Sequence, residues 1–170
     1  CTESGNPYQC TGYRLPTNAE WEYASRAGTQ HPFSADGSGL GDVIADMNSC
    51  PEFAAGTYFQ NNPNLMLEDY AWFCSNSQGA SSPVAYLTPN PWGFYDMQGN
   101  VAEWTNDSYM GQGEYWDPWT FDPTYEYGIV RGGAFWSPPI MLSNEYIEAD
   151  TATDIGHFHV GFRLMRRLND

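Results

Sequence analysis

The sequence predicts a single α+β domain with little regular secondary structure and long ordered loops. Among its 170 residues are 12 Tyr, 9 Phe and 7 Trp, which supply large apolar surfaces for a core. It also contains 17 Gly and 12 Pro, which interrupt helices and strands every few residues. This combination favours short strands and turns over a helical bundle.

The clearest regular element is a helix over residues 18–27. Thr17 and Glu20 match a Thr-x-x-Glu capping box, in which each side chain bonds the backbone N–H of the other residue. Trp21 begins an apolar face on this helix, and Gly28 is expected to end it.

Other stretches indicate strands and loops. A strand is expected near residues 101–104, and "DYAWFCSNS" can hold a short one. The segments "IVRGGAFW" and "HVGFRLMRR" alternate apolar and polar residues, so they are expected to be neighbouring strands. Residues 29–64 are rich in Gly, Ser, Asp and Asn without a sustained period, which predicts a long loop region.

The charge of the chain argues against anionic partners. The formal net charge is -15 and the chain contains no lysine. Such a surface repels nucleic acid and anionic membranes. It also suits bound divalent cations, although solubility alone explains it equally well. No apolar run approaches the ~20 residues that cross a bilayer, so no membrane span is expected.

The four cysteines favour an exported protein. Cys1, Cys10, Cys50 and Cys74 form no CxxC pair and no zinc-ligand spacing with histidine. Two disulfides are expected, and of the three connectivities we favour Cys1–Cys10 with Cys50–Cys74, because each closes a turn-rich segment. The location is then extracellular, cell-surface or periplasmic. The alternative is a cytosolic protein with four reduced thiols.

Four motifs point to a known family. "GYRLPTNAEWEYASRAG", "PNPWGFYDMQGNVAEWTND", "VRGGAFW" and "GFRLMRR" occur in this order between Gly12 and Arg167. In this the chain resembles the formylglycine-generating enzyme (sulfatase-modifying factor) family. The resemblance implies a C-type-lectin-like variant fold with few strands, two helices and much ordered loop.

The resemblance also implies that residues 1–170 are the C-terminal part of a family domain. Family members have an N-terminal portion before the "RLPT" helix, and here only eleven residues precede Gly12. The missing portion is expected on a complementing segment or another protein chain, because its loss would expose much apolar surface.

In the enzymes that the chain resembles, the turn that corresponds to "GFYDMQGNVAEWTND" encloses a structural calcium ion. The implied ligands are the side chains of Asp96 and Glu103 and the carbonyl groups of Gly99 and Val101. Calcium prefers six to eight oxygen ligands and tolerates irregular loops. Two carboxylates within one turn would repel each other unless a positive charge lay between them. The alternative is a solvated acidic turn capped by its own side chains.

Catalysis of the family type is not expected. The resemblance implies a copper-binding cysteine pair at positions near Ser137 and Leu142, and no cysteine follows Cys74. Serine and leucine cannot replace a soft thiolate pair as ligands of Cu(I), so no copper and no catalytic residues are predicted.

Other candidate sites are weaker. His157 and His159 would share one face of a strand and could join a metal site with Asp154, although a polar strand edge explains them better. Arg131 and Arg163 are expected to be buried ion-pair partners. The candidate carboxylates for these two arginines are Glu20 and Glu22.

Three functions remain open. We favour a secreted, calcium-stabilised, non-catalytic domain that binds a partner or builds an assembly. The first alternative is an oxidoreductase of the same fold with different metal chemistry, such as iron. The second is a carbohydrate-binding module with an aromatic stacking surface. The residues of that surface would be Tyr115, Trp116, Trp119, Phe121 and Trp136.

Overall fold

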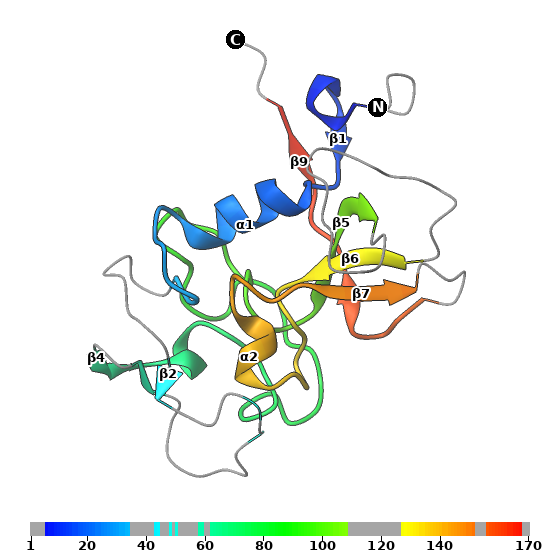
Figure 1. Cartoon of the computed structure of the whole chain (residues 1–170). Helices are drawn as coiled ribbons and strands as arrows, with labels where there is room; N and C mark the ends of the chain where they lie inside the picture. The colour runs from blue at the N-terminus through cyan, green and yellow to red at the C-terminus, as the bar shows by residue number, and fades with distance from the viewer. Residues whose placement is uncertain are drawn as a thin grey trace.

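The protein is described by a computed structural model. The described residues are 6–34, 43–44, 48, 50, 58–59, 62–108, 127–151 and 156–167. Within them, short strands and few helices are joined by long irregular segments (Figure 1). The predicted α+β class with little regular structure is confirmed.

The helices and strands occur in the following order. They are η1 (Pro7–Gln9), β1 (Tyr13–Arg14), α1 (Asn18–Arg26), β2 (Val43–Ile44), β3 (Tyr58–Phe59), β4 (Asn62–Met66), η2 (Leu67–Asp69), β5 (Ala102–Ser108), β6 (Tyr127–Arg131), α2 (Pro139–Leu142), β7 (Glu148–Thr151), β8 (Val160–Gly161) and β9 (Met165–Arg166).

A four-stranded mixed sheet organises the second half of the chain. Its strand order is β7-β6-β5-β8, with β8 parallel to β5 and the other pairs antiparallel. β1 and β9 form a separate two-stranded sheet, so the two ends of the described chain lie side by side (Figure 1). A three-stranded sheet of order β2-β3-β4 completes the set among the described residues.

Helix α1 begins and ends as predicted. The Thr17 hydroxyl accepts a hydrogen bond from the Glu20 backbone N–H at 3.2 Å, and the Glu20 carboxylate accepts one from the Thr17 N–H at 2.8 Å. Ala27 takes the left-handed conformation at the C-cap, and Gly28 follows with a positive φ. Trp21 is buried on the inner face of the helix.

An ion pair also anchors the start of α1. Both guanidinium Nη atoms of Arg14 bond the Glu20 carboxylate, at 2.6 and 2.7 Å. Burial raises the pKa of Glu20, but the hydrogen bonds from Arg14 and from the Thr17 backbone outweigh it, so the pKa lies below its ordinary value. The carboxylate is therefore held in its charged form as a cap.

Two strand predictions are wrong. The segments "IVRGGAFW" and "HVGFRLMRR" are not neighbours, because β6 and β8 pair with opposite sides of β5. The second segment is also divided between β8 and β9, which belong to different sheets. Within "DYAWFCSNS", Trp72 makes only an isolated bridge with Gly99. Alternating polarity predicts which face of a strand is buried but not which strand lies beside it.

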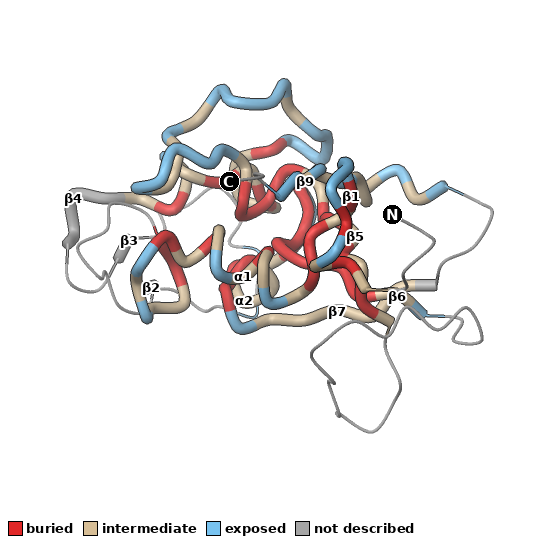
Figure 2. The backbone as a smooth tube through the Cα atoms, turned by 90° about the horizontal axis from the view of Figure 1, so that it is seen from above, coloured by how far each residue is buried: buried red, intermediate tan, exposed pale blue. Residues whose placement is uncertain are grey.

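The core gathers around α1, α2 and β5 (Figure 2). One cluster of it contains Phe33, Leu67, Ala71, Phe73 and Leu142, each at most 1% exposed. These residues come from three segments far apart in the sequence, residue 33, residues 67–73 and α2, so the cluster ties irregular chain to the helix α2. No helix in the described part of the chain is long and apolar enough to span a bilayer.

Candidate functional site

The predicted metal-binding turn is a tightly packed backbone structure. Asp96 and Gly99 both have positive φ angles, of 53° and 77°. A Cβ atom on Gly99 would lie 2.2 Å from the carbonyl oxygen of Trp72, so only glycine fits there. The same carbonyl accepts a hydrogen bond from Asn100 N at 2.7 Å. The turn is thereby fixed against the backbone at Trp72.

Glu103 lies on β5 with its carboxylate buried. One carboxylate oxygen, Oε2, accepts a hydrogen bond from the indole N–H of Trp21 at 2.7 Å and another from Arg163 Nε. The other oxygen accepts from Arg163 Nη2 at 2.7 Å. This bidentate pair is a strong form of ion pair, because two parallel bonds fix the geometry. Glu103 thus joins α1, β5 and the segment between β8 and β9.

The same arginine also reaches the other end of the turn. Arg163 Nη2 donates to the carbonyl oxygens of Tyr95 and Asp96 at 3.1 and 3.2 Å. The Asp96 carboxylate accepts from the backbone N–H of Ala85 at 2.7 Å. Arg163 therefore places a positive charge between Glu103 and the backbone at Asp96. The sequence predicts a positive charge between these two acidic residues.

A pocket of about 370 Å³ opens above this ion pair. Asp96, Val101 and Glu103, three of the four predicted calcium ligands, line it together with Arg163. The remaining lining residues are Val84, Ala85, Gly93, Phe94, Tyr95, Asn100 and Phe162. Two of them are strongly exposed, Val84 at 79% and Phe162 at 65%. The pocket thus has a charged floor and an apolar rim.

The donors at the turn suit a hard cation in kind. A carboxylate has about four lone-pair positions, and hydrogen bonds to Arg163 and Trp21 use three of them on Glu103. One position on Glu103 therefore remains, and carboxylate and backbone carbonyl oxygens are ligand types of calcium. Calcium binding at Asp96, Gly99, Val101 and Glu103 stays a prediction.

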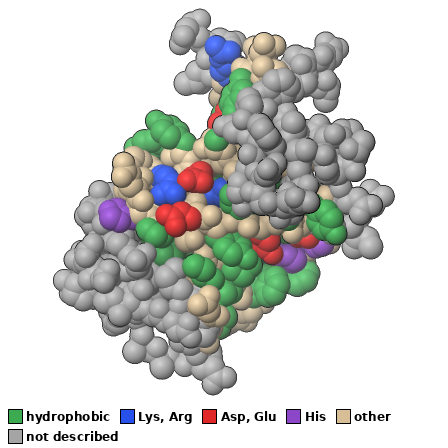
Figure 3. All heavy atoms as spheres, in the orientation of Figure 1, with side chains coloured by type: hydrophobic (Ala, Val, Ile, Leu, Met, Phe, Trp, Pro, Cys, Tyr) green, Lys and Arg blue, Asp and Glu red, His purple; other side chains and the backbone are tan. Residues whose placement is uncertain are grey.

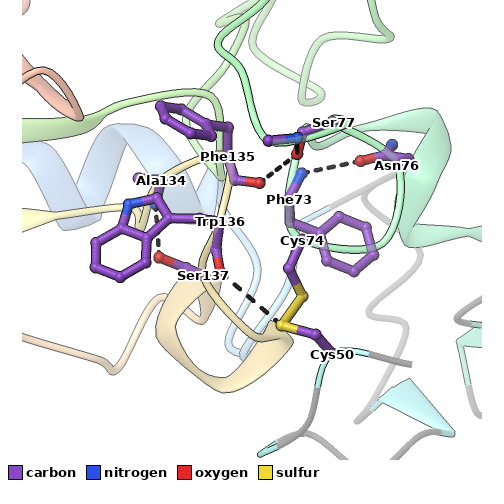
Figure 4. Close-up of a disulfide and its surroundings, with 10 residues drawn as sticks. Cys50, Phe73, Cys74, Asn76, Ser77, Ala134, Phe135, Trp136 and Ser137 are labelled. Atoms are coloured by element: carbon purple, nitrogen blue, oxygen red, sulfur yellow. Dashed lines mark hydrogen bonds between the residues drawn. A yellow bond between two sulfur atoms is a disulfide. The ribbon is translucent and has the colours of Figure 1, made fainter. Parts of the chain in front are cut away.

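The positions that correspond to the copper-binding cysteines are built into the core. Ser137 Oγ accepts a hydrogen bond from Ala134 N at 2.9 Å, and the Ser137 carbonyl accepts from Cys74 N at 3.3 Å (Figure 4). Leu142 has no exposed surface and packs in the core cluster described above. Both side chains therefore have structural contacts and none of the donor chemistry of a thiolate.

The predicted pair Cys50–Cys74 is confirmed. The two residues form a disulfide with a Cα–Cα distance of 5.6 Å. Cys50 Sγ lies 3.9 Å from the carbonyl oxygen of Trp136, so the disulfide lies beside the segment that carries Ser137 (Figure 4). Cys10 is buried. Cys1 lies outside the described residues, so its pairing with Cys10 stays a prediction.

The prediction of a buried ion-pair partner is confirmed for Arg131, whereas Arg163 is an ion-pair partner whose side chain is 25% exposed. Arg131 is buried and bonds Glu22 at 3.0 Å, as expected, and it also bonds the Asn144 carbonyl oxygen and the Asn18 side chain. Arg163 pairs instead with Glu103, a partner that the sequence interpretation missed because it assigned this carboxylate to calcium. Glu20 pairs with Arg14.

The remaining predicted residues are only partly described. Trp136 is half-exposed, whereas Tyr115, Trp116, Trp119 and Phe121 lie outside the described residues, so carbohydrate binding by this surface stays a prediction. His157 and His159 lie close to Asp150. Asp154, their predicted companion, also lies outside the described part of the chain.

Comparisons with known proteins agree with the motifs. A family model described as "Sulfatase-modifying factor enzyme 1-like domain" matches residues 1–168. The chaperone protein LppX of Paenibacillus barcinonensis is 33% identical over 158 residues, which cover 91% of this chain and 49% of that protein. The formylglycine-generating enzyme of Mycobacterium tuberculosis is 30% identical over 180 residues, covering 91% and 51%.

A solved structure shows the same fold. PvdO from Pseudomonas aeruginosa superposes with a TM-score of 0.61 at 27% identity, over 92% of this chain and 53% of that one. The chain spans about half the length of the relatives that it matches.

The substitution Glu103→Gln should destabilise the fold strongly. It removes the charge that Arg163 and Trp21 bind inside the protein, and breaking a buried pair typically costs about 3 kcal/mol or more. Urea unfolding followed by tryptophan fluorescence measures the loss of unfolding free energy.

The matched control is Glu145→Gln, at a carboxylate that is 63% exposed and lies 4.0 Å from Arg26. It should change the unfolding free energy by less than about 0.5 kcal/mol. Equal effects of the two substitutions would show that Glu103 is not a structural anchor.

Proposed function

Because this chain belongs to the family of sulfatase-modifying factor enzyme 1-like domains, we propose that it is a non-catalytic binding domain that acts outside the cytoplasm. One observation carries the proposal. The positions of the copper-binding cysteine pair hold Ser137 and Leu142, which are buried and serve the packing of the core. Serine and leucine lack the thiolate that binds Cu(I), and this supports a role without copper-dependent oxidation.

The binding surface that we propose is the pocket above the Glu103–Arg163 pair. Its rim carries Val84, Phe94, Tyr95 and Phe162, all exposed apolar or aromatic side chains. Aromatic side chains are enriched at protein interfaces relative to the rest of a protein surface. One similar protein is named a chaperone, a class whose members bind other polypeptides. The net charge of -15 favours a partner segment with basic residues around an apolar anchor.

The partner that we propose is a polypeptide that completes the domain. The chain covers about half of each relative, and the pocket rim and the exposed residues Tyr86 and Leu164 add further apolar surface. Contiguous exposed apolar surface is a sign of a protein–protein contact. A segment equivalent to the N-terminal half of the relatives, on the same or another chain, would cover it.

An extracellular, cell-surface or periplasmic location is part of the proposal. The Cys50–Cys74 disulfide supports it, because disulfides form and persist mainly in oxidising compartments.

Calcium at the 93–107 turn is the last part of the proposal. The support is chemical: Asp96 and Glu103 line one pocket, and one lone-pair position of Glu103 is unused. When bound, the ion would add positive charge beside Arg163 and hold the turn against Trp72. The turn is then a braced support for the apolar rim rather than a reaction site.

The chain should not convert a sulfatase-derived cysteine peptide to formylglycine. The purified protein, supplied with copper and oxygen, lacks the thiolate ligands that the reaction needs. Mass spectrometry of the peptide detects conversion, with the Mycobacterium tuberculosis relative as positive control. Conversion above the level without protein would contradict a non-catalytic role.

The substitution Phe162→Ser should release the partner polypeptide. Loss of an aromatic anchor at an interface costs about 2 kcal/mol, roughly a thirty-fold weaker Kd. Native mass spectrometry of the protein purified from its natural source first identifies a polypeptide that travels with it, and titration of the separated components then measures Kd.

Tyr13→Ser is the control for this experiment. Tyr13 is about as exposed as Phe162 but lies on β1, which belongs to a different sheet. Its substitution should leave Kd within about two-fold. A protein that travels alone, or equal losses from both substitutions, would contradict the assigned surface.

Calcium removal should lower the melting temperature. A ligand present at a hundred times its Kd stabilises by about 2.7 kcal/mol, which corresponds to roughly 5–10 °C for a chain of this size. Thermal unfolding is measured after EDTA treatment and again after addition of calcium or of zinc. Calcium alone should restore the melting temperature, and Asp96→Asn should reduce the difference. An identical melt with and without EDTA would rule out calcium at this turn.

A further inference from the structure

Three potential metal ligands lie together at the far end of the molecule from α1. The carboxylate oxygen Oδ2 of Asp150 is 3.7 Å from Nδ1 of His157 and 3.8 Å from Nε2 of His159. One ligand atom from each of the three residues lies within 4.8 Å of the others. No other group of three such ligands occurs among the described histidine, cysteine and acidic residues.

The fold brings these residues together from two edges of the four-stranded sheet. Asp150 lies on β7 opposite Gly128 of β6. His159 comes just before β8, and its carbonyl oxygen accepts a hydrogen bond from Ala102 N of β5 at 2.9 Å. His157 is held by a turn in which its carbonyl oxygen accepts from Val160 N at 3.2 Å. The two histidines therefore lie at a turn, and not along one strand as their spacing predicted.

The distances suit a shared ion better than direct hydrogen bonds. Both nitrogen–oxygen separations exceed the ~3.2 Å limit of a good hydrogen bond. Ligands bonded to one ion at about 2.0–2.2 Å lie about 3–3.5 Å apart, so each histidine nitrogen would move a few tenths of an ångström toward Asp150, and the two histidine nitrogens, which lie within 4.8 Å of each other, would close to the same spacing. All three side chains are 19–26% exposed, which leaves a side open for water or a further ligand.

The surroundings hold the histidine rings in place. Trp136 and Phe158 each contact the His159 ring edge to face, with centroids 5.1 Å apart, and the two histidine rings are also perpendicular. Nδ1 of His159 is buried and makes no hydrogen bond in the described structure. The ring is thus positioned by apolar contacts, with Nε2 turned to Asp150. Figure 3 shows histidine and acidic side chains next to a hydrophobic patch on this face.

The geometry points to a binding site for a divalent first-row transition-metal ion at Asp150, His157 and His159. Two imidazoles and one carboxylate are typical ligands of Zn²⁺ and Fe²⁺ and suit Ca²⁺ poorly. The site is independent of the pocket at Glu103. The proposed site differs from the sequence hypothesis in one ligand. The histidine pair was expected to bind the metal together with Asp154, whereas the third ligand is the β7 residue Asp150.

Zinc titration of the untagged, metal-free protein tests the site. Calorimetry should show one Zn²⁺ bound per chain, and Co²⁺ should give the visible absorption of a nitrogen- and oxygen-ligated ion. The Zn²⁺ affinity should fall by at least about tenfold in each of three variants, His157→Gln, His159→Gln and Asp150→Asn. Even the loss of a residue that only orients a metal ligand weakens metal affinity by that factor. Circular dichroism of the metal-free variants confirms that they are folded.

Two variants serve as matched controls. His31→Gln removes the third histidine of the chain, which lies outside the cluster, and Asp154→Asn removes the acidic residue predicted earlier. Both should keep the wild-type affinity and stoichiometry. If no one-to-one binding is measured with Zn²⁺ at 100 times the protein concentration, the inference is overturned. Wild-type affinity in any of the three ligand variants would also overturn it, as would a loss in Asp154→Asn with none in Asp150→Asn.

Discussion

The contact between Glu103 and Arg163 is the interaction on which the candidate site depends. It lies inside the protein, where an unpaired carboxylate would be costly, and it joins a strand at the centre of the sheet to the segment between β8 and β9. Through Trp21 it also fixes α1, and through the carbonyl oxygens of Tyr95 and Asp96 it fixes the turn. Helix α1, strand β5, the 93–107 turn and the segment between β8 and β9 are thereby held in one arrangement, which explains how an irregular turn can present a defined pocket.

Local signals in the sequence were enough to predict the parts of the fold that local forces determine. The capping box of α1, the strand that became β5 and the Cys50–Cys74 pair were all predicted from residues near each other or from turn-rich spacing. The order of strands was not, because alternating polarity does not say which strands pair, and only the packing of the whole chain puts β5 between β6 and β8. Partners of arginines were equally hard to predict, since Arg163 is 60 residues from Glu103.

Ser137 and Leu142 are held in the family fold by packing and backbone contacts. The Ser137 hydroxyl closes a turn on Ala134, and the Ser137 carbonyl bonds Cys74, so the backbone in this region is held without a thiol. Leu142 fills the core beside Phe33 and Phe73, where a cysteine would be too small. The Cys50–Cys74 disulfide next to this segment adds a covalent restraint in the same place. Stability in this region therefore rests on packing and on the disulfide.

The two cation predictions concern different chemistry and so do not compete. Around Glu103 the donors are oxygens alone, and both carboxylate oxygens of Glu103 already bond the Arg163 guanidinium; oxygen donors suit a hard ion with many weak ligands. Around Asp150 two imidazole nitrogens face one carboxylate, which suits a borderline ion with few strong ligands. An acidic chain attracts both kinds of ion over its whole surface, so charge cannot decide where either is held. The type of donor and its fixed geometry decide which ion each turn suits. The turn at residues 93–107 presents carbonyl and carboxylate groups. The turn at residues 157–160 presents imidazole rings, and the His159 ring packs against Trp136 and Phe158.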